Sequence, residues 1–527
     1  MTDPVLIVGA GPTGLTAALE LSRMGVAVRL IDKRQAPATT SRAIGVQART
    51  LELFEQRGLA EEMVRLGNKG RFASIYRGGK RVFRLDFGHV ESRYPFMLLI
   101  SQAEDRAHPA RGRRSPRRHA PVEYRAGRHR AGCAFEGRLA RPGHPQACGR
   151  KPGASRSALA DQRRRCTQSR AHYARPSVRG PHARGAICAR RSAGRRRPAG
   201  QRHLHLFIRS RLHGPVPNGR RAFPPFASNP LSKPSKDAEP SLDELQRIYD
   251  QRSHIPARFH DLRWSSWFRI NSRMVSRLKV GRLLLGGDAA HIHSPAGAQG
   301  MNTGIQDMIN VSWKLAMVMN GQAPPALLDT YEADRLPVMR GVLFKTDNLT
   351  TVIGTENPIV RTLFNHFGPF IGGAELVQEN ATAGMSQVVL NDRNSSLSEN
   401  HSPGGALRAG DRVPDMNVRL RSDGNWEQTT LLSALDASHL TLVAAVPDGT
   451  TQPSSLKACV PESRFIEIAA DAKDAARFET TFGKAGAAVL VRPDGYAGLT
   501  SPIPSAATHL AAYRRKWFSA SAADAHR

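Results

Sequence analysis

The sequence of 527 residues lacks several features that would place a protein in a simple class. Cysteine is scarce, with five residues and no CxxC spacing, so neither a zinc knuckle nor a dithiol redox pair is indicated. No run of 18 or more apolar residues occurs and no apolar leader precedes Val5, so we expect a cytoplasmic protein without a membrane partner. Acidic residues are also few, since 44 Asp and Glu stand against 77 Lys and Arg, a formal net charge of +33.

The positive charge is concentrated in one interval. Residues 101–200 contain 25 Arg and one Lys against five acids, so this interval holds +21 of the net charge and the rest of the chain only +12. The same interval contains four of the five cysteines but only eight Val, Ile, Leu, Met, Phe, Trp or Tyr residues. Such a segment cannot bury enough apolar surface to offset the entropy of ordering, and we expect it to be largely disordered.

The first 34 residues follow the pattern of a dinucleotide-binding unit. The apolar stretch Val5–Val8 runs into Gly9, Gly11 and Gly14, which have GxGxxG spacing. The first glycine permits a tight turn, the second lets a pyrophosphate approach the backbone, and the third lets a helix pack close to a strand. Asp32 ends the next apolar stretch, where a carboxylate can accept hydrogen bonds from ribose hydroxyls. The pattern predicts binding of FAD or NAD and leaves the choice open.

A second glycine-rich turn occurs far downstream. Leu283–Leu285 predict a strand with Asp288 near its end, and Pro295 and Gly297–Gly300 predict a tight loop before a helix that begins near Met301. A helix N-terminus directed at an isoalloxazine ring would stabilise the negative charge of a reduced flavin. The second turn therefore favours FAD.

Together the two motifs resemble those of the single-component, FAD-dependent aromatic hydroxylases, the group of phenol, hydroxyphenylpropionate and polyketide hydroxylases. The resemblance covers residues 1–104 and about 204–527, and it includes Gly287-Asp288, Ser41–Leu59 and Leu99–Glu104. It implies an α/β fold with a Rossmann-like FAD-binding domain, an interleaved β-sheet substrate domain and a C-terminal thioredoxin-like α/β domain.

The resemblance also implies which residues hold the cofactor. Arg42 and Gln102 are expected to contact the FAD, Asp288 its ribityl chain, and Pro295 with Gly300–Asn302 the flavin ring. The full expected set is Gly9, Ala10, Gly11, Pro12, Thr13, Gly14, Asp32, Lys33, Arg42, Gln102, Asp288, Pro295, Gly300, Met301 and Asn302. No acid–base residue for the substrate is identified from the sequence.

The implied function is hydroxylation of a phenolic or polycyclic aromatic substrate. In this family NADPH, a transient co-substrate, reduces the FAD, and the reduced flavin reacts with O2 to form a C4a-hydroperoxide that transfers one oxygen atom to the ring. The protein orients the reactants and excludes water, because a hydrated hydroperoxide collapses to hydrogen peroxide. A homodimer is compatible with this function and stays open.

Residues 105–203 do not fit the resemblance. The family has here a helix, several strands and an Asp-Gly motif that helps to bind both cofactors, and the motif is absent. An inserted basic arm would bind nucleic acid through phosphate contacts, but the family's own segment would then have to occur elsewhere, and it does not. Arg, Ala, Pro, Gly and His are also what GC-rich coding DNA yields in a wrong reading frame. We therefore favour a compensated pair of frame errors, entering near Asp105 and leaving near Leu204, which would make this chain a catalytically impaired homologue.

Two His-x-His pairs, His203/His205 and His291/His293, raise the question of a metal site. No third ligand at suitable spacing accompanies either pair, and the second pair lies inside the expected flavin loop. We expect no metal site.

The C-terminal third has its own pattern. Asn391–Pro403 is polar and turn-rich, which predicts a linker. Apolar strands, a Pro-Asp-Gly turn at Pro493–Gly495 and a final helix follow, and without a second nearby cysteine we expect a structural or oligomer-contact role. The expected order is the first part of the FAD-binding domain (1–104), the anomalous segment (105–203), a remnant of the substrate-domain sheet (204–275), the second part of the FAD-binding domain with bracing helices (276–390), the linker (391–403) and the thioredoxin-like domain (404–527).

Overall fold

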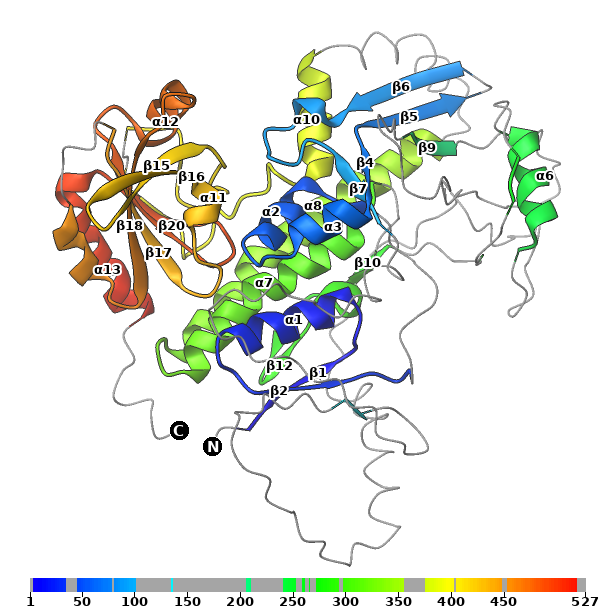
Figure 1. Cartoon of the computed structure of the whole chain (residues 1–527). Helices are drawn as coiled ribbons and strands as arrows, with labels where there is room; N and C mark the ends of the chain where they lie inside the picture. The colour runs from blue at the N-terminus through cyan, green and yellow to red at the C-terminus, as the bar shows by residue number, and fades with distance from the viewer. Residues whose placement is uncertain are drawn as a thin grey trace, which may run out of the picture.

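A computed structural model describes residues 3–34, 45–77, 80–100, 134–135, 205–209, 240–252, 258–260, 265, 272–292, 297–354, 375–401, 404–447 and 453–518 (Figure 1). Of residues 105–203, this set includes only β8 (Ala134–Phe135), which pairs antiparallel with β2 (Val28–Ile31). The prediction of disorder for that interval therefore falls almost entirely outside the described residues. Among the helices described, none is long and apolar enough to span a bilayer.

The N-terminal βαβ unit forms as the sequence predicts. β1 (Val5–Val8) pairs in parallel with β2, and α1 (Pro12–Arg23) connects them. Pro12 suits the first turn of the helix because an N–H is not needed there. Val5 and Ile7 of β1 pack against a buried cluster that includes Leu21 and Ala316, so one face of this parallel pair is covered by helices.

The central helix of the molecule is α7 (Gly300–Met319). It packs along α1 and against α8 (Asp329–Gly354), and most of its residues are buried (Figure 1). Its buried residues include polar ones such as Asp307, Asn310 and Lys314, and a buried polar group needs a partner within the protein. Its Trp313 is 1% exposed and belongs to a core cluster shared with Leu499 and Tyr513 of the C-terminal domain. The two domains thus share one apolar core.

Small sheets and further helices complete the N-terminal part. β9 (His205–Arg209) pairs with β5 (Phe72–Arg77), so hydrogen bonds join the segments on either side of the arginine-rich interval. α6 (Leu242–Arg252) begins at the predicted cap, where Ser241 Oγ accepts a hydrogen bond from the Glu244 amide at 3.1 Å. The remaining elements are α2 (Ala48–Glu55), α3 (Ala60–Leu66), α10 (Glu375–Ser386), β3 (Gly45–Val46), β4 (Asn68–Gly70), β6 (Lys80–Asp86), β7 (Met97–Leu99), β10 (Arg273–Met274), β11 (Lys279–Val280), β12 (Leu283–Leu284) and β13 (His291–Ile292).

The C-terminal domain is built on a seven-stranded sheet in the order β14-β20-β19-β17-β18-β15-β16. β17 and β18 are parallel, whereas β19 is antiparallel to both of its neighbours, β17 and β20. All residues of β17, β19 and β20 are buried, which accounts for their continuous apolar runs. The elements are β14 (Glu399–Asn400), β15 (Asn417–Ser422), β16 (Asn425–Thr430), α11 (Leu431–Ala434), β17 (Leu440–Ala445), β18 (Ser463–Ala470), α12 (Ala475–Phe482), β19 (Ala487–Val491), β20 (Ala497–Ser501) and α13 (Ala506–Trp517).

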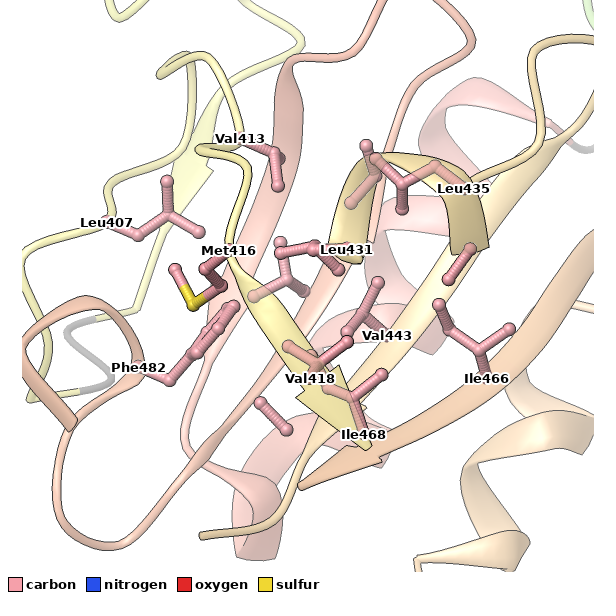
Figure 2. Close-up of a cluster of buried hydrophobic side chains, with 14 of the residues drawn as sticks. Leu407, Val413, Met416, Val418, Leu431, Leu435, Val443, Ile466, Ile468 and Phe482 are labelled. Carbon is pink, nitrogen blue, oxygen red and sulfur yellow. The ribbon is translucent and has the colours of Figure 1, made fainter. Parts of the chain in front are cut away.

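Alternate residues of β17 face two different cores. Val443 points into the cluster of Figure 2, where it lies with Leu431 of α11, Ile468 of β18 and Phe482 of α12. Leu442 points the other way, into the cluster that contains Trp313 and α13. Each fully buried aliphatic side chain of this size contributes about 1.5–3 kcal/mol. The sheet therefore packs against α11 and α12 on one face, and against α13 and Trp313 of α7 on the other.

The described residues 391–401 of the predicted polar linker (391–403) are packed into the C-terminal domain. Leu397 is fully buried, and β14 pairs in parallel with β20. The backbone amide of Asp392 donates to the Gly410 carbonyl at 2.7 Å, and the carboxylate of Asp392 is buried in an ion pair. The buried polar residues of this segment, Asp392 and Ser395, make hydrogen bonds within the fold, whereas residues such as Asn391 and Arg393 are exposed.

A buried ionic network joins the two domains. Arg492, just after β19, contacts Asp392 at 2.6 Å, Asp494 at 3.1 Å and Asp334 of α8 at 3.9 Å. Lys314 of α7 also contacts Asp334, at 2.6 Å. Three carboxylates thus share two cations, which leaves one negative charge in excess. Burial and the charge of Asp334 raise the pKa of Asp392 to about 6, although the positive charge of Arg492 acts to lower it.

Replacing Asp392 with Asn should remove a pH dependence of stability. A carboxyl group whose pKa is higher in the folded chain than in the unfolded chain stabilises the fold when protonated, and that contribution is lost as the pH rises from about 4 to about 6. The free energy of unfolding of the unmodified chain should therefore fall by about 1–3 kcal/mol across this range, relative to Asp392→Asn. Urea unfolding followed by circular dichroism at about pH 4 and about pH 7 measures this change. An equal difference between the two chains at both pH values would contradict the assignment.

Candidate flavin site

The glycine turn after β1 is hydrogen-bonded to the end of β2. Gly9 has a φ of +113°, a region that favours glycine, and its amide donates to the Ile31 carbonyl at 2.7 Å. A Cβ at Gly14 would lie 1.8 Å from the Gly9 carbonyl oxygen, so only glycine lets α1 start this close to β1. A Cβ at Gly11 would meet nothing within 4 Å, so this position faces open space.

The start of α1 is suited to bind an anion. Gly11 is the N-cap residue, and no side chain caps the helix there. First-turn amides have no partner within a helix, and the helix dipole places partial positive charge at this end. Pro12 and Thr13 form the first turn. The open space at Gly11 and the uncapped helix end together fit a pyrophosphate.

Asp32 holds the glycine turn from the end of β2. Its Oδ2 accepts a hydrogen bond from the Ala10 amide and its Oδ1 one from the Arg34 amide, each at 2.8 Å. Burial by itself would raise the pKa of Asp32, but the two amides and the Arg34 charge outweigh it, and the pKa lies below the ordinary value. The carboxylate is therefore ionised at neutral pH and has further lone pairs for hydroxyl donors. Lys33, the next residue, is exposed.

The Gly287-Asp288 turn touches the glycine turn. A Cβ at Gly287 or at Gly304 of α7 would lie 2.7 Å from Thr13 Oγ1, so the Thr13 side chain fills the space beside both glycines. A Cβ at Gly304 would also lie 3.0 Å from the Gly287 Cα. Asp288 follows Gly287 and is exposed. The structure thus brings two glycine turns that are far apart in the sequence to one place.

Asn302 connects the loop before α7 to the start of α2. Its Nδ2 donates to the carbonyl oxygens of Gly45 at 2.9 Å and Ala298 at 2.7 Å, and its Oδ1 accepts from the Gln47 amide at 2.9 Å. Gln47 Nε2 donates to the Gly297 carbonyl oxygen at 2.8 Å. Because the Asn302 side chain is fully buried and used in these bonds, its predicted contact with the flavin would be made by the backbone.

Asp307 of α7 supports the second turn from inside the protein. Its Oδ2 accepts a hydrogen bond from the Gly287 amide at 3.2 Å and is bonded to His291 Nε2 at 2.8 Å, while its Oδ1 accepts from Arg335 Nε at 2.9 Å. Burial opposes ionisation, but Arg335 and His291 hold the pKa of Asp307 below its ordinary value. His291 is thus occupied by a carboxylate, and its sequence partner His293 lies outside the described residues, as does His203. No cluster of three metal-binding side chains occurs within the described part of the chain.

The described cofactor residues fall into two groups that meet at the contact between Thr13 and Gly287. One group is Gly9–Gly14 with Asp32 and Lys33, and the other is Asp288 with Gly300–Asn302, the latter forming the first turn of α7. The predicted contacts Arg42, Gln102 and Pro295 lie outside the described residues.

Sequence reasoning misses Gln47, Asp307 and Arg335. The signal for Asp307 is that it is the one acid in a helix of 20 residues, which indicates an ion pair without identifying the partner. Gly304 lies one helical turn after Gly300, a spacing that indicates close contact on one helix face. The partners lie on other elements, so only the tertiary structure identifies them.

Two family descriptions match the chain. The family described as "FAD binding domain" matches residues 2–107 and 209–346, and the one described as "Aromatic-ring hydroxylase, C-terminal" matches residues 407–521. The first match is interrupted over the arginine-rich interval.

Curated relatives and solved structures match over most of their length. The chain is 30% identical to 6-methylpretetramide 4-monooxygenase of Streptomyces rimosus, over 93% of this chain and 89% of that protein. It is 29% identical to pentachlorophenol 4-monooxygenase of Sphingobium chlorophenolicum, over 79% of this chain and 76% of that protein.

The fold is similar to OxyS anhydrotetracycline hydroxylase of Streptomyces rimosus (TM-score 0.58, 23% identity, 98% of this chain and 99% of that one). It is also similar to the flavin-dependent monooxygenase PieE, solved in complex with FAD and substrate (TM-score 0.60, 18% identity, 97% and 98%).

These matches and the meeting of the two glycine turns lead to one conclusion: the chain belongs to the FAD-dependent aromatic monooxygenases, with an FAD-binding domain in two sequence segments and an aromatic-ring hydroxylase C-terminal domain.

Proposed function

We propose that this protein hydroxylates a phenolic or polycyclic aromatic substrate, using FAD, NADPH and O2. The observation that carries the proposal is the contact of Thr13 with Gly287 and Gly304, which unites a pyrophosphate-type turn with the turn at Asp288. The names of the relatives support the substrate class, because they act on a polycyclic pretetramide and on a chlorinated phenol.

The chain's own residues fit FAD at this site. The open space at Gly11 and the uncapped start of α1 would hold the pyrophosphate, and the ionised Asp32 would accept ribose hydroxyls. Asp288 would bind the ribityl chain, and the first turn of α7 would direct its positive end at the flavin ring. Asn302 and Gln47 would keep the loop before α7 in place.

Bound FAD would supply the redox chemistry, which is hydride acceptance from NADPH and activation of O2 for transfer of one oxygen atom to the ring. The protein's contribution is binding, orientation and exclusion of water from the reacting atoms.

We also propose that the C-terminal domain is thioredoxin-like and structural. The order β18-β17-β19-β20, with one parallel pair and two antiparallel pairs, supports this, as do α12 and α13 in their places along the chain. Cys459 is the only free cysteine in the described part of the chain, which supports a role without dithiol chemistry.

A second candidate is an impaired homologue without turnover, and a specific observation favours it. Leu6 and Val8 of β1, on the face opposite α1, are 56% and 55% exposed, and β1 pairs with β2 alone among the described strands. Parallel sheets are normally covered on both faces. Among the described residues this face of β1 is open, and the FAD-binding match is interrupted between residues 107 and 209.

The purified chain separates the two candidates. If the proposed function is right, the protein should be yellow, show a flavin absorbance spectrum, and oxidise NADPH faster when a phenolic substrate is added. The impaired homologue should bind little or no flavin and show no substrate-stimulated NADPH oxidation. Flavin content per chain and NADPH absorbance are the two measurements.

The coding DNA provides an independent test of the frame-error hypothesis. Reading the interval from Asp105 to Leu204 in the other two frames should yield a segment with helical or alternating apolar periodicity and an Asp-Gly motif. A chain rebuilt with that segment should bind FAD more tightly than the present chain. If neither frame gives such a segment, the hypothesis is wrong.

Gly11→Ala tests the pyrophosphate position. The added Cβ would meet nothing within 4 Å in the protein, so the free energy of unfolding should change by no more than about 1 kcal/mol. FAD affinity, measured by quenching of flavin fluorescence, should fall by about tenfold or more because the methyl group occupies the space of the phosphate.

Gly341→Ala is the matched control, because its Cβ also meets nothing within 4 Å but lies on α8, away from the glycine turn. It should leave FAD affinity unchanged. Equal FAD affinities of Gly11→Ala and the unmodified chain would show that the pyrophosphate does not approach Gly11.

A further inference from the structure

The hairpin turn between β19 and β20 extends from the C-terminal domain into the FAD-binding domain. The Gly495 amide donates to the Arg492 carbonyl at 2.8 Å, and Gly495 has a φ of +74°, which confirms the predicted Pro-Asp-Gly turn. A Cβ at Gly495 would lie 3.0 Å from Arg49 Nη2. Glycine at this position therefore lets the turn approach α2 closely.

The carboxylate of Asp494 is bonded to α7. Its Oδ2 accepts hydrogen bonds from Asn310 Nδ2 at 2.9 Å and from Trp313 Nε1 at 3.1 Å, and its Oδ1 accepts from Arg492 Nε at 3.1 Å. Asp494 and Asn310 are 2% exposed and Trp313 is 1% exposed, so water does not compete for these bonds. The carboxylate thus fixes α7 to the hairpin at two successive turns of the helix.

The backbone of the same turn is bonded to Arg49 of α2 and to Arg57, which follows the C-terminal end of that helix. The Asp494 carbonyl oxygen accepts from Arg49 Nη2 at 2.8 Å, and the Pro493 carbonyl oxygen accepts from Arg57 Nη2 at 3.2 Å. Arg49 is itself paired with Glu52 at 3.2 Å, and both side chains are buried. One short turn therefore fixes two helices of the other domain.

The N-terminal ends of these two helices form the candidate flavin site. Gln47, just before α2, is bonded to Asn302 in the first turn of α7 and to the Gly297 carbonyl in the loop before it. α2, α7 and the hairpin turn thus form a closed set of hydrogen-bonded contacts, in which the turn determines how far apart the two helices lie.

We propose that Asp494 is a positioning residue for the flavin site, and that it acts through α2 and α7 on the loop Gly297–Gln299 and the first turn of α7. This inference rests on the proposed function, because these are the segments proposed to meet the flavin ring. Through Asp494, the C-terminal domain would contribute to cofactor binding although it does not contain the proposed cofactor-binding residues.

Hydrogen exchange of the full chain without added cofactor tests the coupling. Asp494→Asn keeps the size of the side chain but replaces one acceptor oxygen with an NH2 group, so the donors of α7 and of Arg492 can no longer all be satisfied. Mass spectrometry should show amide exchange faster by about tenfold or more in peptides covering 45–56 and 297–310.

Asp471→Asn is the matched control. Asp471 is 4% exposed and accepts hydrogen bonds from Gln428 Nε2 at 3.1 Å and the Lys473 amide at 2.9 Å, both within the C-terminal domain. The two variants are compared at temperatures equally far below their own Tm. A general loss of stability then does not by itself produce a difference in exchange rate between them. Asp471→Asn should leave exchange in peptides 45–56 and 297–310 unchanged. Faster exchange confined to residues 487–501 in Asp494→Asn, or equal changes in the two variants, would overturn the proposal.

A flavin measurement completes the test. Asp494→Asn should raise the Kd for FAD by about tenfold and change the visible spectrum of the bound flavin, whereas Asp471→Asn should change neither. An unchanged Kd and spectrum in Asp494→Asn would also overturn the proposal. If the unmodified chain binds no FAD, the proposed function fails, and the exchange experiment still decides whether Asp494 positions these segments.

Discussion

The close approach of three backbone segments at Gly287 is the constraint on which the rest of the site depends. Thr13 at the start of α1 fills the space beside Gly287 and Gly304, and a side chain at either glycine would collide with it. Interiors are close-packed, so such an overlap can be relieved only by moving α1 away from α7. That movement would separate the phosphate end of the site from its flavin end. The steric fit of Thr13 with Gly287 and Gly304 therefore keeps the phosphate end of the proposed site next to its flavin end.

A second constraint is electrostatic and operates between the domains. The carboxylates of Asp334, Asp392 and Asp494 meet Lys314 and Arg492 in a buried region. Buried ion pairs add little net stability compared with an apolar core, but removing one partner leaves an uncompensated charge and is strongly destabilising, by about 3–5 kcal/mol. The network consequently specifies one arrangement of the two domains. It explains why a domain that follows the FAD-binding part in the sequence is packed against its central helix.

The two faces of the N-terminal β1–β2 pair differ in exposure. Its helix-covered face is packed, whereas Leu6 and Val8 on the other face are more than half exposed. Covering that face requires apolar side chains, and residues 101–200 contain only eight of the large apolar types. Charge repulsion among 25 arginines opposes the collapse of such a segment onto an apolar surface. The exposed face of β1 and the composition of residues 101–200 are the two observations behind the proposal of an impaired homologue.

The sequence by itself determined the features that depend on local geometry. The GxGxxG turn, the parallel β1–β2 pair, the Ser241 cap, the turn at Gly495 and the start of α7 all follow from the spacing of glycines, caps and apolar residues along one stretch of chain. The resemblance to aromatic hydroxylases also came from such local motifs. Tertiary structure alone decided which distant groups meet. Nothing in the spacing pairs Asp307 with Arg335 or Asp494 with Asn310, and the polar segment 391–403 reads as a linker until its partners are seen. The physical reason is that a buried polar group is stabilised by whichever partner the fold brings to it, and the identity of that partner is a property of packing rather than of neighbouring sequence.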